Sequence, residues 1–388
     1  MTFIENPLFV LAILCLNVVI SEWLVEKTFF RHLGTALLVI VITAILANLK
    51  IIPTASDESA LYGAIFTYIA PISIFYLLLS VNLRQLKEAG LPMLIMFLIG
   101  TAGTVLGVIV GMQFVNGAET LGSLFNAIGG MYTATYTGGG INFNAVALHY
   151  KVMEEGVLFA GAVAVDNIMT TLWMIATIII PKMLWRFLPA PAKTNEKQSS
   201  LENSGAQNVD DRETINPFDL GIMLALGLAV LWISNLLADA FTGLGISVPS
   251  ILILTTIALV MAQFPVFQKL RGNQVLGMFT VYLFLAVVGA YCELAALGKI
   301  GDIGITLLWF ATILVLVHGL LTFGFGIFLK QDWDLVAVAS QANIGGSTSA
   351  LALAKSFGRN DLLLPAILVG SLGNGIGTYL GFIVAGML

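Results

Sequence analysis

The sequence predicts an all-α membrane protein that crosses the bilayer many times. Of its 388 residues, 58% are hydrophobic and only 10% are Asp, Glu, Lys or Arg, and the mean hydropathy is +0.96. A soluble domain carries roughly 25% charged residues, so this composition excludes an ordinary soluble fold. Apolar stretches long enough to cross a bilayer as helices recur along the whole chain. A duplicated polar segment, described below, predicts how these helices are arranged.

The apolar stretches fall into two sets of similar pattern. Each is expected to form a transmembrane helix, and a Gly-rich polar segment lies between the last two stretches of each set. The predicted spans are about 7–24, 34–49, 58–81, 91–115 and 156–181 in the first set, and about 217–238, 246–264, 274–297, 304–328 and 361–386 in the second.

The two Gly-rich segments look like copies of each other. One reads GMYTATYTGGGINFN at 130–144, and the other reads ASQANIGGSTSALAL at 339–353. In lipid, a backbone interrupted by glycines is tolerated only where it faces protein or a water-filled cavity. Two such interruptions at matching positions of two halves indicate a transporter binding site. We therefore expect an internal repeat, with Gly-rich hairpins at about 117–152 and 331–357.

The distribution of positive charge favours hairpins that enter the membrane and return. In that arrangement each half has five spans, the halves are inverted, and 14 of the 17 Lys and Arg residues lie on one side. If both segments crossed the membrane instead, 8 Lys and Arg residues would lie on one side and 9 on the other. Because cytoplasmic loops carry an excess of Lys and Arg, the re-entrant arrangement is preferred. It places both termini outside the cytoplasm of a bacterial inner membrane.

The chain divides into two repeats and a connection between them. The first repeat is predicted at 1–186 and the second at 217–388. The polar stretch at 187–216 is rich in Ser, Asn, Pro and charged residues, so it is predicted to be a flexible cytoplasmic linker.

The hairpin tips supply the predicted binding site for a solute. Glycines let a ligand approach the backbone closely, and the free N–H groups at a helix start attract anions. This favours a small organic anion or zwitterion that bears a carboxylate. Close packing of small residues is the alternative role of such segments. The predicted substrate-binding residues are Thr137, Gly138, Gly139, Gly140, Asn142, Asn343, Gly345, Gly346, Ser347 and Thr348.

Asp166 is the predicted site for a coupling cation. It lies deep in the stretch 156–181, where a charge costs at least about 2.5–3.5 kcal/mol. Asn167 beside it, Thr170 and Thr171 one turn later, and the oxygens of the hairpins offer further ligands. The alternative is a protonated Asp166 with a structural hydrogen bond. The predicted cation-coupling residues are Asp166, Asn167, Thr133 and Asn374, with sodium or a proton as the ion and no other metal or cofactor.

Several other functions lack a sequence signal. The chain has no phosphate-binding Walker loop, no metal-ligand spacing and no basic patch for nucleic acid. No Ser–His pair is placed for hydrolysis within the membrane, so we expect no enzyme. His318 stands alone in an apolar stretch and is interpreted as a packing or hydrogen-bonded histidine.

The motifs YTGGGINFNAVA, QANIGGSTSALALAKS and LPAILVGSLGNGIGTYLGF, together with the Asp166 stretch, resemble the bacterial YjcL-like family, domain of unknown function 819. More remotely they are similar to the sodium/glutamate symporters and the sodium-dependent 2-hydroxycarboxylate transporters. The resemblance implies inverted repeats with re-entrant hairpins, a homodimer and an elevator-like transport domain. It also implies that substrate and sodium bind at the matching tips, Gly138, Gly139, Gly140, Asn142, Gly345, Gly346, Ser347 and Thr348.

We therefore expect a secondary active transporter that couples sodium, or a proton, to the uptake of a small carboxylate-bearing solute such as an amino acid, hydroxy acid or small peptide. The first alternative is a monovalent cation/proton antiporter without an organic substrate. The further alternative is an intramembrane enzyme or receptor.

The charge distribution makes a testable prediction about topology. Single cysteines placed at Ser199, in the linker, and at Ala118, before the first tip, should react with a membrane-impermeant maleimide from opposite sides. Labelling in intact cells and in inverted vesicles measures this. Reaction of both positions from the same side would rule out the inverted arrangement.

Overall fold

The fold is entirely helical in the part of the chain that the structure describes. The computed structural model describes residues 6–28, 30, 34–54, 57, 59–81, 83, 86–187, 216–246, 248–292 and 300–388. Residues 1–5 and nearly all of the linker predicted at 187–216 lie outside this description. Within the described ranges, eight helices are long and apolar enough to cross a membrane, and α2 and α11 are shorter apolar helices. The prediction of an all-α polytopic membrane protein is therefore confirmed.

Every predicted span corresponds to a helix or to consecutive helices. The elements are α1 (Pro7–Lys27), α2 (Thr35–Asn48), α3 (Ala60–Ala64), the π-helix η4 (Ile65–Ile69), α4 (Ala70–Leu78), η5 (Leu86–Ala89), α5 (Leu91–Phe114), α6 (Gly117–Thr120), η6 (Gly122–Leu124), α7 (Phe125–Gly138), α8 (Gly140–His149), η7 (Val152–Glu154), α9 (Gly156–Phe187), α10 (Pro217–Gly243), α11 (Ser250–Ala262), α12 (Pro265–Gln268), α13 (Asn273–Ala290), α14 (Ile300–Phe328), α15 (Trp333–Ile344), α16 (Gly346–Ser356), η9 (Asn360–Leu362) and α17 (Leu363–Met387).

The first helix of each half begins with the same local chemistry. Asn6 precedes Pro7, and its side chain accepts from the backbone N–H of Leu8 at 2.9 Å. Asn216 precedes Pro217 and accepts from the N–H of Asp219 at 2.8 Å. An Asn cap satisfies an otherwise free N–H, and a proline at the first helical position lacks the N–H that would need a partner.

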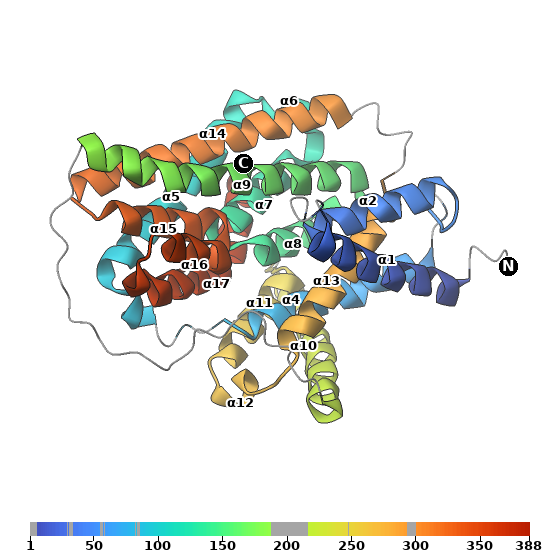
Figure 1. The fold of residues 1–388 in the computed structure, drawn as a ribbon. Coiled ribbons are helices and arrows are strands. Elements are labelled where there is room, and N and C mark those ends of the chain that lie inside the picture. Colours follow the sequence, from blue (N-terminus) through green and yellow to red (C-terminus); the bar gives the residue numbers. More distant parts are fainter. Residues whose placement is uncertain are drawn as a thin grey trace.

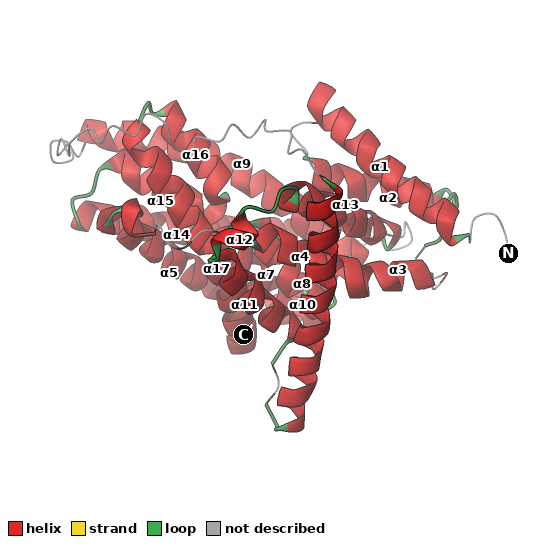
Figure 2. Ribbon diagram, turned by 90° about the horizontal axis from the view of Figure 1, so that it is seen from below, coloured by secondary structure: helices red, strands yellow, loops and turns green. Residues whose placement is uncertain are grey.

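The helices form two groups (Figure 1). In the first group, α5 packs along α14, α7 along α17, and α9 against α14 and α15. In the second group, α13 packs on α2 and α4, while α10 and α11 pack on each other and on α4. Contacts between the groups are sparser and run mainly through α4–α8, α9–α13 and α2–α9. Figure 2 shows α10 extending away from the rest of the molecule.

Small residues bring the backbones of the first group close together. A β-carbon added to Gly107 of α5 would lie 2.6 Å from the carbonyl oxygen of Leu314 of α14. One turn away, a β-carbon on Gly111 would lie 2.9 Å from the Phe310 ring. Helix association in membranes depends on such close packing, because lipid supplies no hydrophobic drive between helices.

This packing predicts opposite effects for two glycine substitutions. Gly107→Ala forces α5 and α14 apart and should lower the free energy of unfolding by about 1–3 kcal/mol. Gly221→Ala, in α10, meets no atom within 4 Å and should be neutral or stabilising by about 0.5–1 kcal/mol. Thermal unfolding of both variants in detergent measures the difference. Equal melting temperatures would contradict the proposed role of Gly107.

Candidate functional site

Each of the two Gly-rich segments is a helix that breaks at glycine. Helix α7 ends at Gly138, and Gly139 then adopts a φ of +100° before α8 begins. Helix α15 ends at Ile344, and α16 begins at Gly346 with a φ of +74°. A residue with a side chain rarely adopts such angles, which explains the glycines at these two positions.

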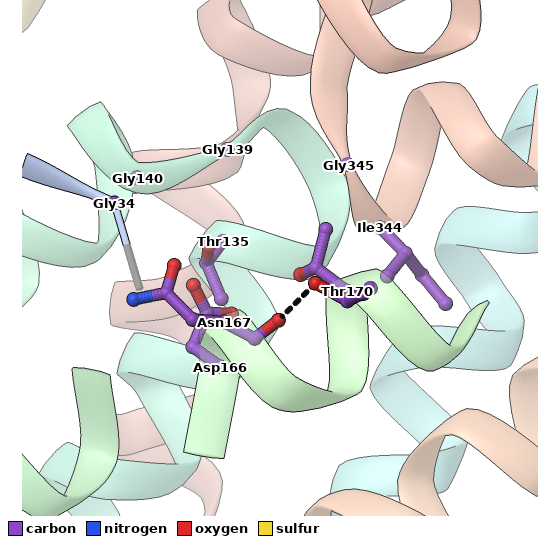
Figure 3. A pocket seen from close by; sticks show the side chains of 10 residues that line it. Gly34, Thr135, Gly139, Gly140, Asp166, Asn167, Thr170, Ile344 and Gly345 are labelled. Carbon is purple, nitrogen blue, oxygen red and sulfur yellow. Dashed lines mark hydrogen bonds between the residues drawn. The ribbon is translucent and has the colours of Figure 1, made fainter. Parts of the chain in front are cut away.

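The two breaks lie beside each other and border a pocket. A β-carbon added to Gly346 would lie 3.8 Å from the carbonyl oxygen of Gly138. The pocket encloses about 300 Å³ (Figure 3). Its walls come from both breaks, from α9 and from the start of α2. The lining residues are Gly34, Thr135, Gly139, Gly140, Asp166, Asn167, Thr170, Thr171, Ile344 and Gly345.

Helix α9 supplies the polar wall. Asp166 and Thr170 are separated by one helical turn and so share a face. Asn167 and Thr171 are similarly related, and the Thr171 hydroxyl donates to the Asn167 carbonyl at 2.8 Å (Figure 3). The carboxylate of Asp166 lies near the hydroxyl of Tyr136, and Oδ1 of Asp166 and that hydroxyl are both buried without a well-formed hydrogen bond to the described residues. Among the described lining residues, one side chain is a carboxylate and none is basic.

Five of the predicted site residues line this pocket together: Gly139, Gly140, Gly345, Asp166 and Asn167. The structure thus brings the predicted cation residues Asp166 and Asn167 to the predicted hairpin tips.

Other predicted substrate residues form packing contacts near the breaks. Asn142 is buried, accepts from the Thr378 hydroxyl at 2.7 Å and donates to the Gly373 carbonyl at 3.5 Å. Asn343 donates to the Thr101 hydroxyl at 2.9 Å, and its Oδ1 has no hydrogen-bond partner among the described residues. These amides join each broken helix to a neighbouring helix.

The remaining predicted substrate residues lie close to the breaks but do not line the pocket. The backbone of Gly138 is in close contact with Gly373, and the Ser347 backbone packs against Gly370. The Thr137 hydroxyl is buried and has no hydrogen-bond partner in the part of the chain that the structure describes. Thr348 is exposed.

The two other predicted cation residues lie outside the lining. The Thr133 hydroxyl is buried in α7 and donates to the Gly129 carbonyl at 2.9 Å, within its own helix. Asn374 of α17 lies behind the first break, and its Oδ1 would be 3.8 Å from a β-carbon added to Gly139.

Sequence reasoning missed Gly34 and Ile344 as lining residues. Gly34 precedes α2 with a φ of +74° and is the lining residue from the second helix group. Nothing in its sequence neighbourhood relates it to the hairpins, so no local pattern could have found it. Ile344 adjoins the predicted Gly345 and could have been included by proximity alone.

The fold and the pocket define a polytopic α-helical membrane protein with a polar site at two helix breaks. The chain belongs to the DUF819 family, described as a protein of unknown function, whose profile matches residues 9–388. It is also similar to the uncharacterized membrane protein YjcL of Bacillus subtilis (strain 168). The two are 29% identical over 348 residues, which cover 87% of this chain and 85% of the relative. The family resemblance expected from the hairpin motifs is therefore confirmed.

The first break predicts different outcomes at two adjacent glycines. Gly139→Ala places a side chain at a φ of +100° and a ψ of 178°, a combination that is essentially restricted to glycine, and should cost roughly 1–3 kcal/mol of folding free energy. Gly140→Ala should be nearly neutral, because an added β-carbon meets no atom within 4 Å. Thermal unfolding of the two purified variants provides the comparison. An equal loss in both would show that the break is not held by the conformation of Gly139.

Proposed function

We propose that the protein is a secondary active transporter for a small carboxylate-bearing organic solute, coupled to sodium or to a proton. The observation that carries this proposal is the pocket itself, where two broken helices and a deep carboxylate meet. Transporter sites are typically built from discontinuous helices near the middle of the bilayer. The proposed solutes are amino acids, hydroxy acids and small peptides.

The helix starts support binding of a carboxylate. Helices α8 and α16 both begin at the pocket, and neither has a side-chain hydrogen bond at its N-cap. The first N–H groups of a helix have no intrahelical acceptor, and the helix dipole favours negative charge there. Together with a pocket of small-molecule size, this arrangement suits one carboxylate group.

The α9 wall supports binding of a cation. Asp166 provides the charge, and the hydroxyls of Thr135, Thr170 and Thr171 provide neutral oxygens in the same lining. A sodium ion or a proton on Asp166 would remove the cost of an uncompensated charge within the membrane. Loading of the cation would thus favour entry of the anionic group of the solute.

The arrangement of helices supports an inverted repeat with re-entrant hairpins. Helix α7 packs on α8 and α15 on α16, as the two arms of a hairpin would. In such a repeat, α2, α4, α5, α7 and α9 of the first half correspond to α11, α13, α14, α15 and α17 of the second. The contact of α2 with α13 then matches that of α11 with α4, and the contact of α7 with α17 matches that of α15 with α9. Helix α5 packs on its own counterpart, α14. We further propose a homodimer in the bacterial inner membrane, with both termini outside.

The two helix groups support an elevator-type movement. The pocket belongs to the first group, but Gly34 closes one side from the second group. Sliding of the first group past the second would therefore uncover or cover the pocket without taking it apart.

The alternative function is a monovalent cation/proton antiporter without an organic substrate. It is favoured by the single carboxylate and by the lack of a basic side chain among the described lining residues. Uptake and proton-flux assays in vesicles, with a sodium gradient and with or without candidate solutes, separate the two functions.

Asp166→Asn tests the coupling site, because it keeps the shape of the side chain and removes its charge. In the wild type, sodium but not choline should stabilise the purified protein, since a ligand that binds only the folded state raises its stability. The variant should lose this stabilisation and its sodium-dependent uptake. Proton coupling would instead give uptake that follows pH and ignores replacement of sodium by choline.

Asp239→Asn is the matched control, because Asp239 is an exposed acid on α10, away from the pocket. It should behave as the wild type in both assays. If Asp166→Asn transports with unchanged dependence on sodium and pH, Asp166 is not the coupling residue.

A further inference from the structure

His318 is fully buried in α14 and bonds to other helices through both ring nitrogens. Its Nδ1 lies 2.9 Å from the carbonyl oxygen of Gly100 and 3.0 Å from the hydroxyl of Thr104, both on α5. Its Nε2 lies 2.8 Å from the hydroxyl of Ser340 on α15. The ring therefore connects three helices of the first group.

Hydrogen-bond chemistry assigns the protons in this network. A carbonyl can only accept, so Nδ1 of His318 carries a proton. The Thr104 hydroxyl gives its own proton to the Tyr136 carbonyl, so the single Nδ1 proton is shared between the Gly100 carbonyl and the Thr104 oxygen. The indole N–H of Trp173 can only donate, and it lies 3.0 Å from the Ser340 hydroxyl oxygen. Ser340 accepts that bond and donates its own proton to Nε2. The neutral ring with hydrogen on Nδ1 uses every donor and acceptor, which is the usual condition of buried polar groups.

The hydrogen bonds of His318 lead to helices that line the pocket. We call its bond to Thr104 one arm of the network and its bond to Ser340 the other. The Thr104 hydroxyl donates to the carbonyl of Tyr136 at 2.9 Å, in the last turn of α7 before the break at Gly139. Ser340 lies one turn before Ile344, the lining residue at the end of α15. Trp173 lies on α9 one turn beyond the lining residue Thr170.

We propose that His318 is a positioning residue. It fixes the relative positions of the two helix breaks and of α9 around the pocket without touching a ligand. It acts on α7 through Thr104, and on α15 and α9 through Ser340. This role concerns the geometry of the pocket. It rests on the proposed function in one respect only, which is that the geometry would align a transported solute. Its test uses the shape of the pocket and needs no solute.

The probe is a cysteine at Gly140, which lines the pocket, is exposed and has room for a side chain. Cys15 and Cys292 are first replaced by Ala. The measured quantity is the rate at which a small water-soluble maleimide alkylates the Gly140→Cys protein. Ser340→Ala and Thr104→Val each remove one arm of the network and should change this rate by about fivefold, the equivalent of one buried hydrogen bond.

The controls are Thr322→Val and Ser234→Ala. Both hydroxyls are fully buried and bond only within their own helices, Thr322 to the His318 carbonyl at 2.7 Å and Ser234 to the Val230 carbonyl at 2.7 Å. These variants should leave the alkylation rate within twofold of the reference, although thermal unfolding should show a comparable loss of stability. A rate change in the controls equal to that in the arm variants would overturn the proposal.

The decisive experiment is a set of double-mutant comparisons. In a His318→Leu protein, Ser340→Ala and Thr104→Val should each change the rate less than they do in the presence of His318, because the bonds to the ring are already lost and only the Ser340–Trp173 and Thr104–Tyr136 bonds remain. In a His318→Asn protein, the amide can replace the Nδ1 donor but does not reach Ser340. There Thr104→Val should still have its full effect, whereas Ser340→Ala should have a smaller effect than in the presence of His318, because only its bond to Trp173 remains to be lost.

The His318→Asn comparison keeps the proposal falsifiable if His318→Leu does not fold. An effect of Ser340→Ala in the His318→Asn background that is as large as its effect in the presence of His318 would show that Ser340 acts independently of the ring. That result would rule out the positioning role and leave His318 as a residue that only packs between helices.

Discussion

The need to satisfy backbone N–H and C=O groups within lipid governs this structure. A continuous helix meets that need by itself, but α7–α8 and α15–α16 do not, because both break at glycines. The protein surrounds the breaks with other helices, above all α17, α9 and α5. The groups freed by the breaks are thereby shielded from lipid and face each other across a polar pocket. Packing of the first helix group and the position of the pocket both follow from this requirement.

The same requirement explains why the glycines serve different purposes. Gly139 and Gly346 allow backbone angles that other residues avoid, and so make the breaks possible. Gly138 and Gly373 let α7 and α17 touch through their backbones. Gly103, Gly107 and Gly111 do the same for α5 and α14. In the sequence these glycines look alike. The structure shows which of them allow an unusual backbone angle and which of them allow two helices to pack closely.

Much of the fold could be predicted, because apolar periodicity and length determine which segments cross the membrane. The helix breaks could be found because Gly, Thr, Ser and Asn contrast sharply with the apolar stretches around them. Asp166 was prominent as a deep acid. Sequence could not reveal that Asn142 and Asn343 bond to other helices, since their partners Thr378 and Thr101 are remote in the chain. Gly34 likewise depends on tertiary packing alone.

The two short apolar helices have a consequence for the membrane itself. Helix α2 has 14 residues and α11 has 13, so at 1.5 Å per residue each is roughly 20 Å long. The hydrocarbon core of a typical bilayer is about 30 Å thick. A span shorter than the hydrocarbon core is accommodated by local thinning of the bilayer, by flanking side chains that reach to the interface, or by association with other helices. Both helices belong to the second group, so this adjustment would fall beside the second group and not beside the helices that carry the breaks.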